Sequence, residues 1–201
     1  MYVPKHFAME SLADQHALIE AFDFGLLVSQ GADGLFATHI PFVLKRDEGE
    51  FGTLYGHVAR ANGHAELFGQ PALAVFSGPH GYVSPVWWSD RSANVPTWNY
   101  AAVHCYGTPA AIEGDQLKLV SLMTEKHEGV AGWSPRELKP ELAKALPKGF
   151  VPFRLEIARI EGKAKLSQNK PAAERVRVIE LLRGAGQSEI AALMQRELNK
   201  V

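Results

Sequence analysis

The sequence lacks the features that mark several large classes of protein. It has a single cysteine, Cys105, among 201 residues, so no disulfide can form within the chain. No apolar run approaches the ~20 residues that span a bilayer, and the first residues do not follow the basic-then-apolar pattern of a signal peptide. We therefore expect a cytoplasmic protein without a membrane partner.

An excess of charge of one sign is also lacking. The chain has 21 Lys and Arg against 22 Asp and Glu, a net charge of −1. Surfaces that bind nucleic acid need clustered basic residues, so this balance disfavours DNA binding but leaves room for a local patch. No dinucleotide fingerprint, P-loop, HExxH or CxxC pattern occurs, so the sequence predicts no metal site.

Hydrophobic patterning predicts several short strands that are mostly linked by turns. A loop rich in Gly, Pro and aromatic residues is expected over 78–88, and Pro41 is expected to mark a bulge or a strand edge. The turn lengths favour an antiparallel sheet or barrel over a parallel sheet. The expected strands cover 24–29, 35–45, 51–58, 72–77, about 97–112 and 150–160.

Helix signals surround these strands. Ser11 and Asp14 resemble a capping box, and Ser134 followed by Pro135 is a second start signal, in a helix that Pro140 should shorten or kink. The expected helices cover 11–22, 115–128 with Asp115 as cap, 134 onward, 171–183 capped by Asn169, and 188–199 capped by Ser188. We expect a main domain over 1–169 and a helical appendage over 170–201.

Two dense polar clusters lie in the first half of the chain. Thr38 and His39 fall in a predicted strand, where His39 is equally well explained as a residue on a solvated face. His57, Arg60 and Asn62 fall at the end of the next strand, where the Arg60 fork suits a phosphate but also suits a surface ion pair.

Aromatic residues mark the middle of the chain. Tyr82 and Ser84 can bond a ring edge or a phosphate, or Tyr82 can pack inward. Trp98 and Tyr100 follow Pro96 and open an apolar strand. Aromatic faces beside hydrogen-bonding groups suit a flat polar ligand, and they equally suit core aromatics whose polar atoms need partners.

A basic cluster follows the last predicted strand. Lys163, Lys165 and Ser167 alternate along one face of an extended segment that leads into a helix N-terminus. An anion is chemically reasonable there, and an ordinary basic strand end followed by a helix cap is the alternative.

Six segments together resemble the PaiB-like family of FMN-binding negative transcriptional regulators. The resemblance implies an α+β fold: a mostly antiparallel split β-barrel of the FMN-binding type, with peripheral helices and a C-terminal helix pair. It also implies a homodimer with flavin at the subunit interface. The segments are MYVPKHF (1–7), ATHIPF (37–42), GHVARAN (56–62), FSGPHGYVSP (76–85), VPTWNY (95–100) and GKAKLSQN (162–169).

The resemblance also implies a cofactor site and a choice of functions. Arg60 and Lys163 or Lys165 would hold the FMN phosphate, and the remaining cluster residues would line the flavin. A flavin-binding regulator is the first hypothesis, a flavin-dependent oxidoreductase the second, and a haem-binding or haem-degrading protein a distant third. The predicted cofactor-binding residues are Thr38, His39, His57, Arg60, Asn62, Tyr82, Ser84, Trp98, Tyr100, Lys163, Lys165 and Ser167.

Overall fold

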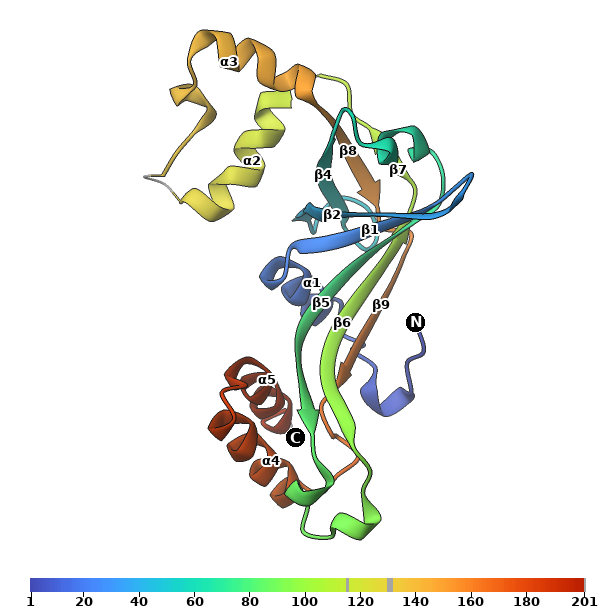
Figure 1. Ribbon diagram of the computed structural model, residues 1–201, viewed down its shortest axis with the longest axis vertical. Coiled ribbons are helices and arrows are strands. Elements are labelled where there is room, and N and C mark those ends of the chain that lie inside the picture. Colours follow the sequence, from blue (N-terminus) through green and yellow to red (C-terminus); the bar gives the residue numbers. More distant parts are fainter. Residues whose placement is uncertain (115, 130–131, 201) are drawn as a thin grey trace. The chain divides into compact units, whose positions relative to one another are not determined.

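A computed structural model describes residues 1–114, 116–129 and 132–200 as an α+β fold with two antiparallel sheets (Figure 1). The strand order is β2-β1-β5-β6-β9 in one sheet and β3-β4-β8-β7 in the other. The strands are β1 (Phe24–Gly31), β2 (Gly34–Pro41), β3 (Val43–Lys45), β4 (Thr53–Ala59), β5 (Ala72–Val83), β6 (Thr97–Gly107), β7 (Pro109–Ala111), β8 (Phe150–Glu156) and β9 (Arg159–Lys165).

Helices and short 3₁₀ turns connect and cover the strands. The α-helices are α1 (Leu12–Ala21), α2 (Gln116–Glu128), α3 (Pro140–Ala145), α4 (Ala172–Gly184) and α5 (Ser188–Leu198). The 3₁₀ turns are η1 (Lys5–Phe7), η2 (Gly63–Leu67), η3 (Pro85–Trp87), η4 (Arg91–Ala93), η5 (Pro135–Glu137) and η6 (Leu146–Gly149).

The chain forms two compact units, and several strands contribute to both. We call residues 1–18, 77–103 and 161–200 the helix-pair unit, because it holds α4 and α5. We call residues 19–76 and 104–160 the hairpin unit, because it holds the antiparallel pairs β1–β2 and β3–β4. Each unit has a hydrophobic core of its own.

The core of the hairpin unit is aromatic. Phe42 lies edge-on to Phe76 at 5.3 Å and to Phe153 at 6.1 Å between ring centroids, and all three are buried. Leu27, from β1, and Leu155, from β8, are also fully buried. Edge-to-face contacts of this kind add to the free energy gained by burial.

The core of the helix-pair unit lies between the helices and the strands. The apolar faces of α4 and α5 pack on each other, and α5 carries Ile190 and Met194 inward at helical spacing. Gly81 on β5 allows this approach, because a Cβ there would lie 2.3 Å from Gln187 Oε1. Figure 1 shows α4 and α5 side by side along one end of β5.

Four strand predictions needed correction. The segment expected as one strand over 35–45 is two strands, β2 and β3, in different sheets, and the strand expected over about 97–112 is likewise divided into β6 and β7. Residues 78–83, expected as loop, continue β5. Pro79 is tolerated in this strand because β1, whose pairing aligns Leu26 with Val75, begins at Phe24 and does not reach Pro79. The strand expected over 150–160 is two strands, because the chain turns between β8 and β9.

The helix predictions were confirmed in outline and wrong at several caps. Asp14 N–H donates to Ser11 Oγ at 3.2 Å, as predicted. Ser134 and Glu137 form a full capping box, but Pro140 limits that helix to the single turn η5. Helix α4 begins at Ala172 and has no side-chain cap, so the prediction of an Asn169 cap was wrong. The predicted Ser188 cap was wrong as well, because Gln187 is the N-cap of α5 and Ser188 is its first residue. Asp115 lies outside the described residues.

Candidate functional site

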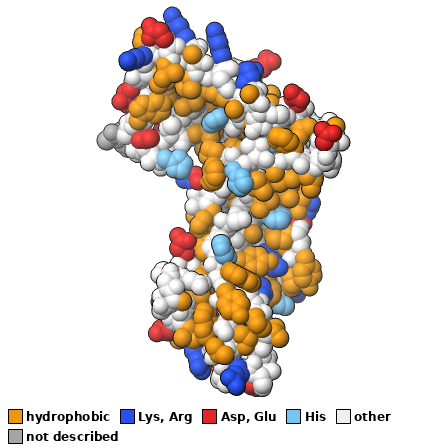
Figure 2. Space-filling view, in the orientation of Figure 1, with side chains coloured by type: hydrophobic (Ala, Val, Ile, Leu, Met, Phe, Trp, Pro, Cys, Tyr) orange, Lys and Arg blue, Asp and Glu red, His pale blue; other side chains and the backbone are white. Residues whose placement is uncertain are grey.

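The strands of the helix-pair unit turn a row of aromatic residues away from the helices. Side chains alternate along a strand, so Val83 faces α4 and α5 while Tyr82 and Trp98 are accessible. Trp98 is 54% exposed and Tyr82 is 39% exposed, and their rings lie 5.8 Å apart. His80 lies 6.0 Å from Trp98. Figure 2 shows hydrophobic side chains gathered on the visible surface beside α5.

Two lysines of β9 stand near this aromatic row. Lys163 is buried, donates to Tyr2 O at 3.0 Å, and lies 5.2 Å from the centroid of the Tyr100 ring. Lys165 donates to Thr97 Oγ1 and, at 2.9 Å, to Trp98 O. Burial, and to a lesser degree the charge of Lys163, lower the pKa of Lys165.

A pocket of about 280 Å³ opens at this end of the helix-pair unit. None of the described residues that line it is Asp or Glu, and two are lysines. A cleft of this composition favours a negatively charged ligand that also has an apolar part. The lining residues are His6, Phe7, Trp88, Ala93, Asn94, Val95, Thr97, Asn99, Lys165, Ser167, Asn169 and Lys170.

The second lysine of the pocket, Lys170, is placed by a tight turn. Lys170 N–H donates to Ser167 O at 3.0 Å, which folds the chain back after β9. Its Nζ donates to Asn94 Oδ1 and lies 5.3 Å from the centroid of the buried Trp88 ring. Lys165 and Lys170 thus reach the pocket from opposite sides of this turn, and both are held by uncharged groups.

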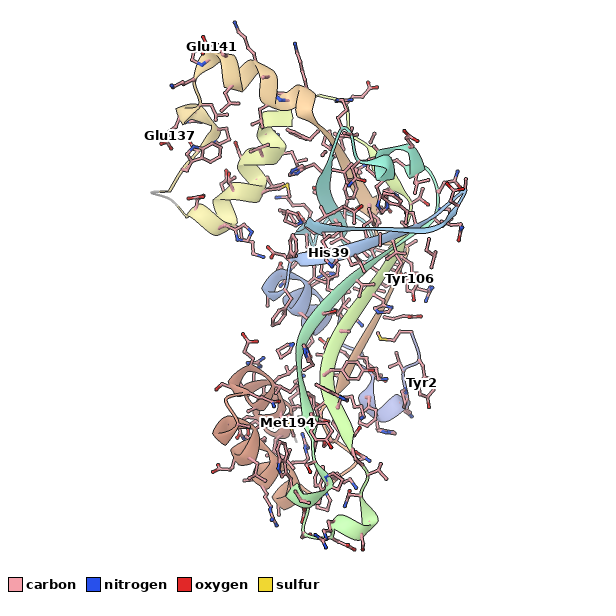
Figure 3. All side chains as sticks on the ribbon, viewed as in Figure 1. Tyr2, His39, Tyr106, Glu137, Glu141 and Met194 are labelled. Atoms are coloured by element: carbon pink, nitrogen blue, oxygen red, sulfur yellow. The ribbon has the colours of Figure 1, made fainter. Side chains whose placement is uncertain are left out.

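The turn itself is held by a buried polar pair. Ser167 has φ +62°, a left-handed backbone conformation that residues other than Gly rarely adopt. Ser167 Oγ donates to Asn99 Oδ1 at 3.1 Å, and Asn99 Nδ2 donates back at 2.9 Å. Asn99 Nδ2 also lies 3.2 Å from the sulfur of Met194, labelled in Figure 3. The Ser167 hydroxyl is therefore already committed within the protein.

The hairpin unit contains a separate polar cluster, which is closed. His64 is fully buried, with Nδ1 3.0 Å from Thr38 Oγ1 and Nε2 3.0 Å from Ser29 Oγ. Asn62 caps η2 by accepting from His64 N–H at 2.9 Å, and its amide is 3.4 Å from Thr38 Oγ1. Burial lowers the pKa of His64. This cluster joins β1, β2 and η2 through neutral hydrogen bonds.

Other predicted residues of the hairpin unit also make internal contacts. Arg60 Nε donates to Lys148 O at 2.7 Å and its Nη2 donates to Phe150 O at 3.1 Å, so two of its donors anchor the start of β8. His57 Nδ1 lies 3.3 Å from Met123 Sδ, and burial lowers its pKa. His39 is exposed on β2 beside Phe24, as Figure 3 shows for its position.

The predicted site residues thus fall into two groups. Tyr82, Ser84, Trp98, Tyr100, Lys163, Lys165 and Ser167 belong to the helix-pair unit, whereas Thr38, His39, His57, Arg60 and Asn62 belong to the hairpin unit. Ser84 precedes η3 and is not among the residues that line the pocket. The flavin contacts of all twelve residues stay a prediction.

Sequence reasoning missed several residues of the pocket. Lys170, Asn94 and Trp88 line the pocket but are not among the predicted cofactor-binding residues. The signal available was a third lysine directly after the basic cluster that ends at Asn169. Asn94 had no comparable signal, because only the fold brings it to Lys170.

The described residues were compared with the patterns of a metal site and of a membrane-spanning helix, and they fit neither. These residues contain no group of three or more His, Cys, Asp or Glu arranged to hold a metal ion. No helix within the described ranges has the length and apolar character needed to cross a membrane. Burial raises the pKa of the Cys105 thiol to about 12, which disfavours the thiolate form that acts as a nucleophile.

Comparison with known proteins decides the family. Residues 1–159 match the family model described as "Putative FMN-binding domain". The chain is 32% identical over 210 residues to "Protease synthase and sporulation protein PAI 2" of Bacillus subtilis, covering 100% of this chain and 99% of that protein. The chain belongs to the PaiB-like family. The predicted family is therefore confirmed, with FMN as the cofactor that this family membership assigns.

Solved structures support the fold. The flavocytochrome Anf3 from Azotobacter vinelandii aligns with a TM-score of 0.64 at 20% identity, over 81% of this chain and 72% of that one. The FAD and heme binding protein from Mycobacterium smegmatis aligns with a TM-score of 0.61 at 16% identity, over 83% and 77%. At these identities the likeness shows the fold alone, and it confirms the predicted split barrel.

Proposed function

We propose that this PaiB-like protein binds FMN on the helix-pair unit, with the phosphate in the lysine pocket. The observation that carries this assignment is a pocket with two lysines and no lining carboxylate among the described residues. Lys165 donates to the backbone O of Trp98, and the exposed rings of Trp98 and Tyr82, 5.8 Å apart, supply apolar surface of the kind that a flavin ring covers.

The residues present fit the negative charge and the apolar ring of FMN. Lys165 and Lys170 would hold the phosphate, and Trp98, Tyr82 and Tyr100 would cover the ring. Lys163 would add positive charge, because it has no carboxylate within ion-pair distance among the described residues. Bound flavin supplies electron and hydride transfer, which no side chain of the protein provides.

The predicted residues of the hairpin unit remain candidates for flavin contact in their own right. Arg60 keeps Nη1 free of the two carbonyl contacts described above, so Nη1 can still donate to an anion. We rank it below the lysine pocket because part of its donor set already anchors β8. Thr38 and Asn62 rank lower still, since each is engaged in the closed cluster around His64.

We further propose that the flavin-bearing form is a cytoplasmic homodimer that acts as a negative regulator of transcription. Exposed Val86, Val95 and Trp98 give the helix-pair unit an apolar surface that a second copy would cover. Helices α4 and α5 each carry Glu as well as Arg, so their charge is mixed, and direct DNA contact is disfavoured. Light scattering for mass and a gel shift at physiological salt test these two points.

An oxidoreductase that uses FMN is the second candidate function. The exposed His80 and Tyr82 are titratable groups next to Trp98, and such groups suit proton transfer beside a flavin. Haem binding remains third, since only fold-level likeness to haem-binding structures favours it. A visible absorption spectrum separates haem binding from the two flavin-based candidates: flavin bands support the first two, and a Soret band would support the third.

The decisive experiment is reconstitution. Purified protein is mixed with FMN, desalted, and examined by visible absorption and by flavin fluorescence. Retained flavin at close to one per chain is the expected result. Protein that remains colourless after desalting, and that leaves FMN fluorescence unchanged in a titration, would contradict FMN binding.

A further inference from the structure

Helix α4 and the turn that leads to α5 bury polar atoms whose hydrogen-bonding capacity is unused. Arg175 is 5% exposed, and its Nε and Nη2 have no hydrogen-bond partner among the described residues. The Oε1 atom of Gln187, directly before α5, is buried and likewise unpartnered within the described chain. An unpaired buried polar group costs free energy, and a buried charge costs more. The packing of α4 and α5 therefore carries a cost that other contacts must offset.

A second arginine shows what the Arg175 side chain lacks. Arg46 donates from the same two atoms, Nε and Nη2, to the two carboxylate oxygens of Glu20. The acidic residue whose charge acts on Arg175 is Glu197, and its carboxylate lies 3.3 Å from Lys200 Nζ. Burial lowers the pKa of Arg175 more than the charge of Glu197 raises it. The neighbours of Arg175 therefore compensate little of the cost of burying it.

Apolar contacts hold the α4–α5 pair closed against this cost. Side chains from both helices and from β5 form one cluster in which each is 1% exposed or less: Val83, Val178, Leu182, Ile190 and Met194. Their burial favours the packed state, and the unpaired polar atoms oppose it. Around His64 in the hairpin unit, by contrast, both ring nitrogens have partners. We expect an element with such opposing contributions to open at a lower free-energy cost than a core whose polar atoms are paired.

The lysine pocket and the core of the α4–α5 pair share a wall. Trp88 lines the pocket and also belongs to the buried cluster of the two helices. Asn99 lines the pocket too, and its Nδ2 lies 3.2 Å from the sulfur of Met194 on α5. Lys170 lines the pocket just before α4 begins, with its ammonium group 5.3 Å from the centroid of the Trp88 ring. A ligand in the pocket therefore meets residues whose positions depend on the packed helices.

The chain enters α4 through a turn that is strained. Ser167, between β9 and α4, has φ +62°, a conformation that persists only where surrounding contacts hold it. The contact that holds it here is the pair of hydrogen bonds between Ser167 and Asn99. Since Asn99 also contacts Met194, the turn, the pocket wall and α5 are linked through one side chain.

From these observations we infer that the α4–α5 pair is a two-state element, which opens away from Val83 and Trp88 and which a ligand in the lysine pocket holds closed. Opening gives Arg175 and Gln187 to water, and closing buries the apolar faces. A ligand that requires Trp88 and Lys170 in place binds the closed state better, so it shifts the balance toward that state. The pair thereby responds to occupancy of the pocket. The identity of the ligand rests on the FMN binding proposed above, whereas the opening of the pair does not.

Hydrogen exchange read by mass spectrometry tests the opening on protein without ligand. The variants are Arg175→Met and, as a matched control, Arg177→Met on the exposed face of the same helix. Removing a buried unpaired charge favours packing, so Arg175→Met should slow exchange across α4 and α5 about tenfold. Arg177→Met should leave that exchange unchanged, and neither variant should alter exchange in β4. Circular dichroism checks that both variants fold.

The same measurement has clear contrary outcomes. Exchange across α4 and α5 that is unchanged or faster in Arg175→Met would overturn the inference, because the buried guanidinium would then not favour opening. Wild-type α4 and α5 that exchange as slowly as β4 would overturn it as well.

Exchange in the presence of FMN tests the coupling. None of the described residues of α5 lines the pocket, so slower exchange there reports closure and not direct contact. At FMN tenfold above its Kd, exchange in α5 should slow about tenfold in wild-type protein. The effect should be smaller in Lys170→Met at the same FMN concentration. It should persist in the control Lys144→Met, which replaces an exposed lysine of α3 that does not line the pocket.

The failures of the two proposals look different. FMN that binds, as flavin fluorescence shows, without slowing exchange in α5 would overturn the coupling and leave flavin binding intact. Protein that binds no FMN would contradict the proposed function. Sodium phosphate then replaces FMN as the probe: slower exchange in α5 supports the coupling, and unchanged exchange overturns it.

Discussion

The two polar clusters of this protein differ in what their hydrogen-bonding groups do. Around His64, both ring nitrogens lie at 3.0 Å from hydroxyl groups, and the side chain is fully buried. In the lysine pocket, Lys165 and Lys170 face a cavity of about 280 Å³ and retain unused donors. A closed cluster stabilises the fold, whereas an open one with uncompensated charge is available to a ligand.

Because of this difference, polar motifs that look alike in the sequence have different roles in the structure. The segments ATHIPF and GHVARAN carry polar side chains in the sequence, as GKAKLSQN does. In the structure, however, Thr38 and Asn62 are engaged with His64, while Lys165 is exposed to a pocket. Residue type alone does not separate a structural polar group from a binding one, because the separation depends on which partners the fold supplies.

The largest expected effect is on binding at the open cluster. Replacing both lysines, as in Lys165→Met with Lys170→Met, should weaken FMN binding about a hundredfold if each contributes about tenfold. The free energy of unfolding should change little, because neither lysine has a carboxylate partner to leave unpaired. Fluorescence titration and urea unfolding of the same sample measure both quantities. A large loss of stability with unchanged FMN affinity would show that the lysines stabilise the fold and do not bind the ligand.

The second effect is on stability at the closed cluster. His64→Ala should lower the free energy of unfolding by about 2–4 kcal/mol, because it leaves a cavity and removes the partner of the buried Ser29 hydroxyl and of the half-buried Thr38 hydroxyl. The affinity ratio of FMN to riboflavin should stay the same. His39→Ala, at an exposed position of β2, is the control, and its effect should lie within about 0.5 kcal/mol. Equal losses for both variants would show that the cluster around His64 is not a stabilising one.

Acid should lower the free energy of unfolding through two buried histidines, one of which is the centre of the closed cluster. Burial lowers the pKa of His64 and of His57 below the ordinary value of about 6.5. In the unfolded chain both take up a proton at a higher pH than in the fold. Their stabilising contribution is therefore complete above the unfolded pKa and is lost as the pH falls through the folded pKa.

Urea unfolding at several pH values measures this acid effect. The urea concentration at the unfolding midpoint should fall as the pH drops below about 6.5, the ordinary pKa of histidine. The variant that combines His57→Gln with His64→Gln should show a flatter dependence over that range. A wild-type midpoint that stays constant or rises on acidification would contradict the assigned direction.

A smaller effect is expected at the turn that places Lys170. Ser167→Ala should cost about 1–2 kcal/mol, because the buried Asn99 amide loses its partner. Ser167→Gly loses the same hydroxyl but relieves the positive φ, so it should be the more stable variant of the two by about 1 kcal/mol. Thermal unfolding of both variants gives this order, and a more stable Ala variant would argue against backbone strain at this turn.

The smallest effect on stability is expected at the aromatic row. Trp98→Ala should change the free energy of unfolding by less than about 0.5 kcal/mol, because the ring is more than half exposed. Flavin fluorescence should nevertheless be quenched less by this variant, since the ring that covers the flavin is missing. Unchanged quenching would place the flavin ring elsewhere.

Much of the fold followed from local patterns, and the exceptions have physical causes. The alternation in Phe153, Leu155 and Ile157 predicted a half-buried strand, and all three are buried. The segment after Phe76 was expected as a loop because of its Gly and Pro content. Gly81 is there because α5 packs against the backbone, a requirement that only the tertiary fold reveals.

The candidate site could be predicted only in part. Lys165 was identified because it alternates with Lys163 and Ser167 along an extended segment, and Trp98 because it follows Pro96 at the start of an apolar strand. Lys170 and Asn94 escaped because their meeting depends on a turn with positive φ at Ser167 and on the loop around η4. Single-sequence patterns carry no signal for contacts between residues 76 positions apart.

The most direct test of the central claim observes the phosphate itself. Phosphorus NMR of FMN is recorded with wild-type protein, with the double variant Lys165→Met and Lys170→Met, and with the control Lys144→Met. The phosphate resonance should shift and broaden with wild-type protein and with the control, and should remain that of free FMN with the double variant. A bound phosphate resonance that is identical in all three samples would contradict a flavin site built on the lysine pocket.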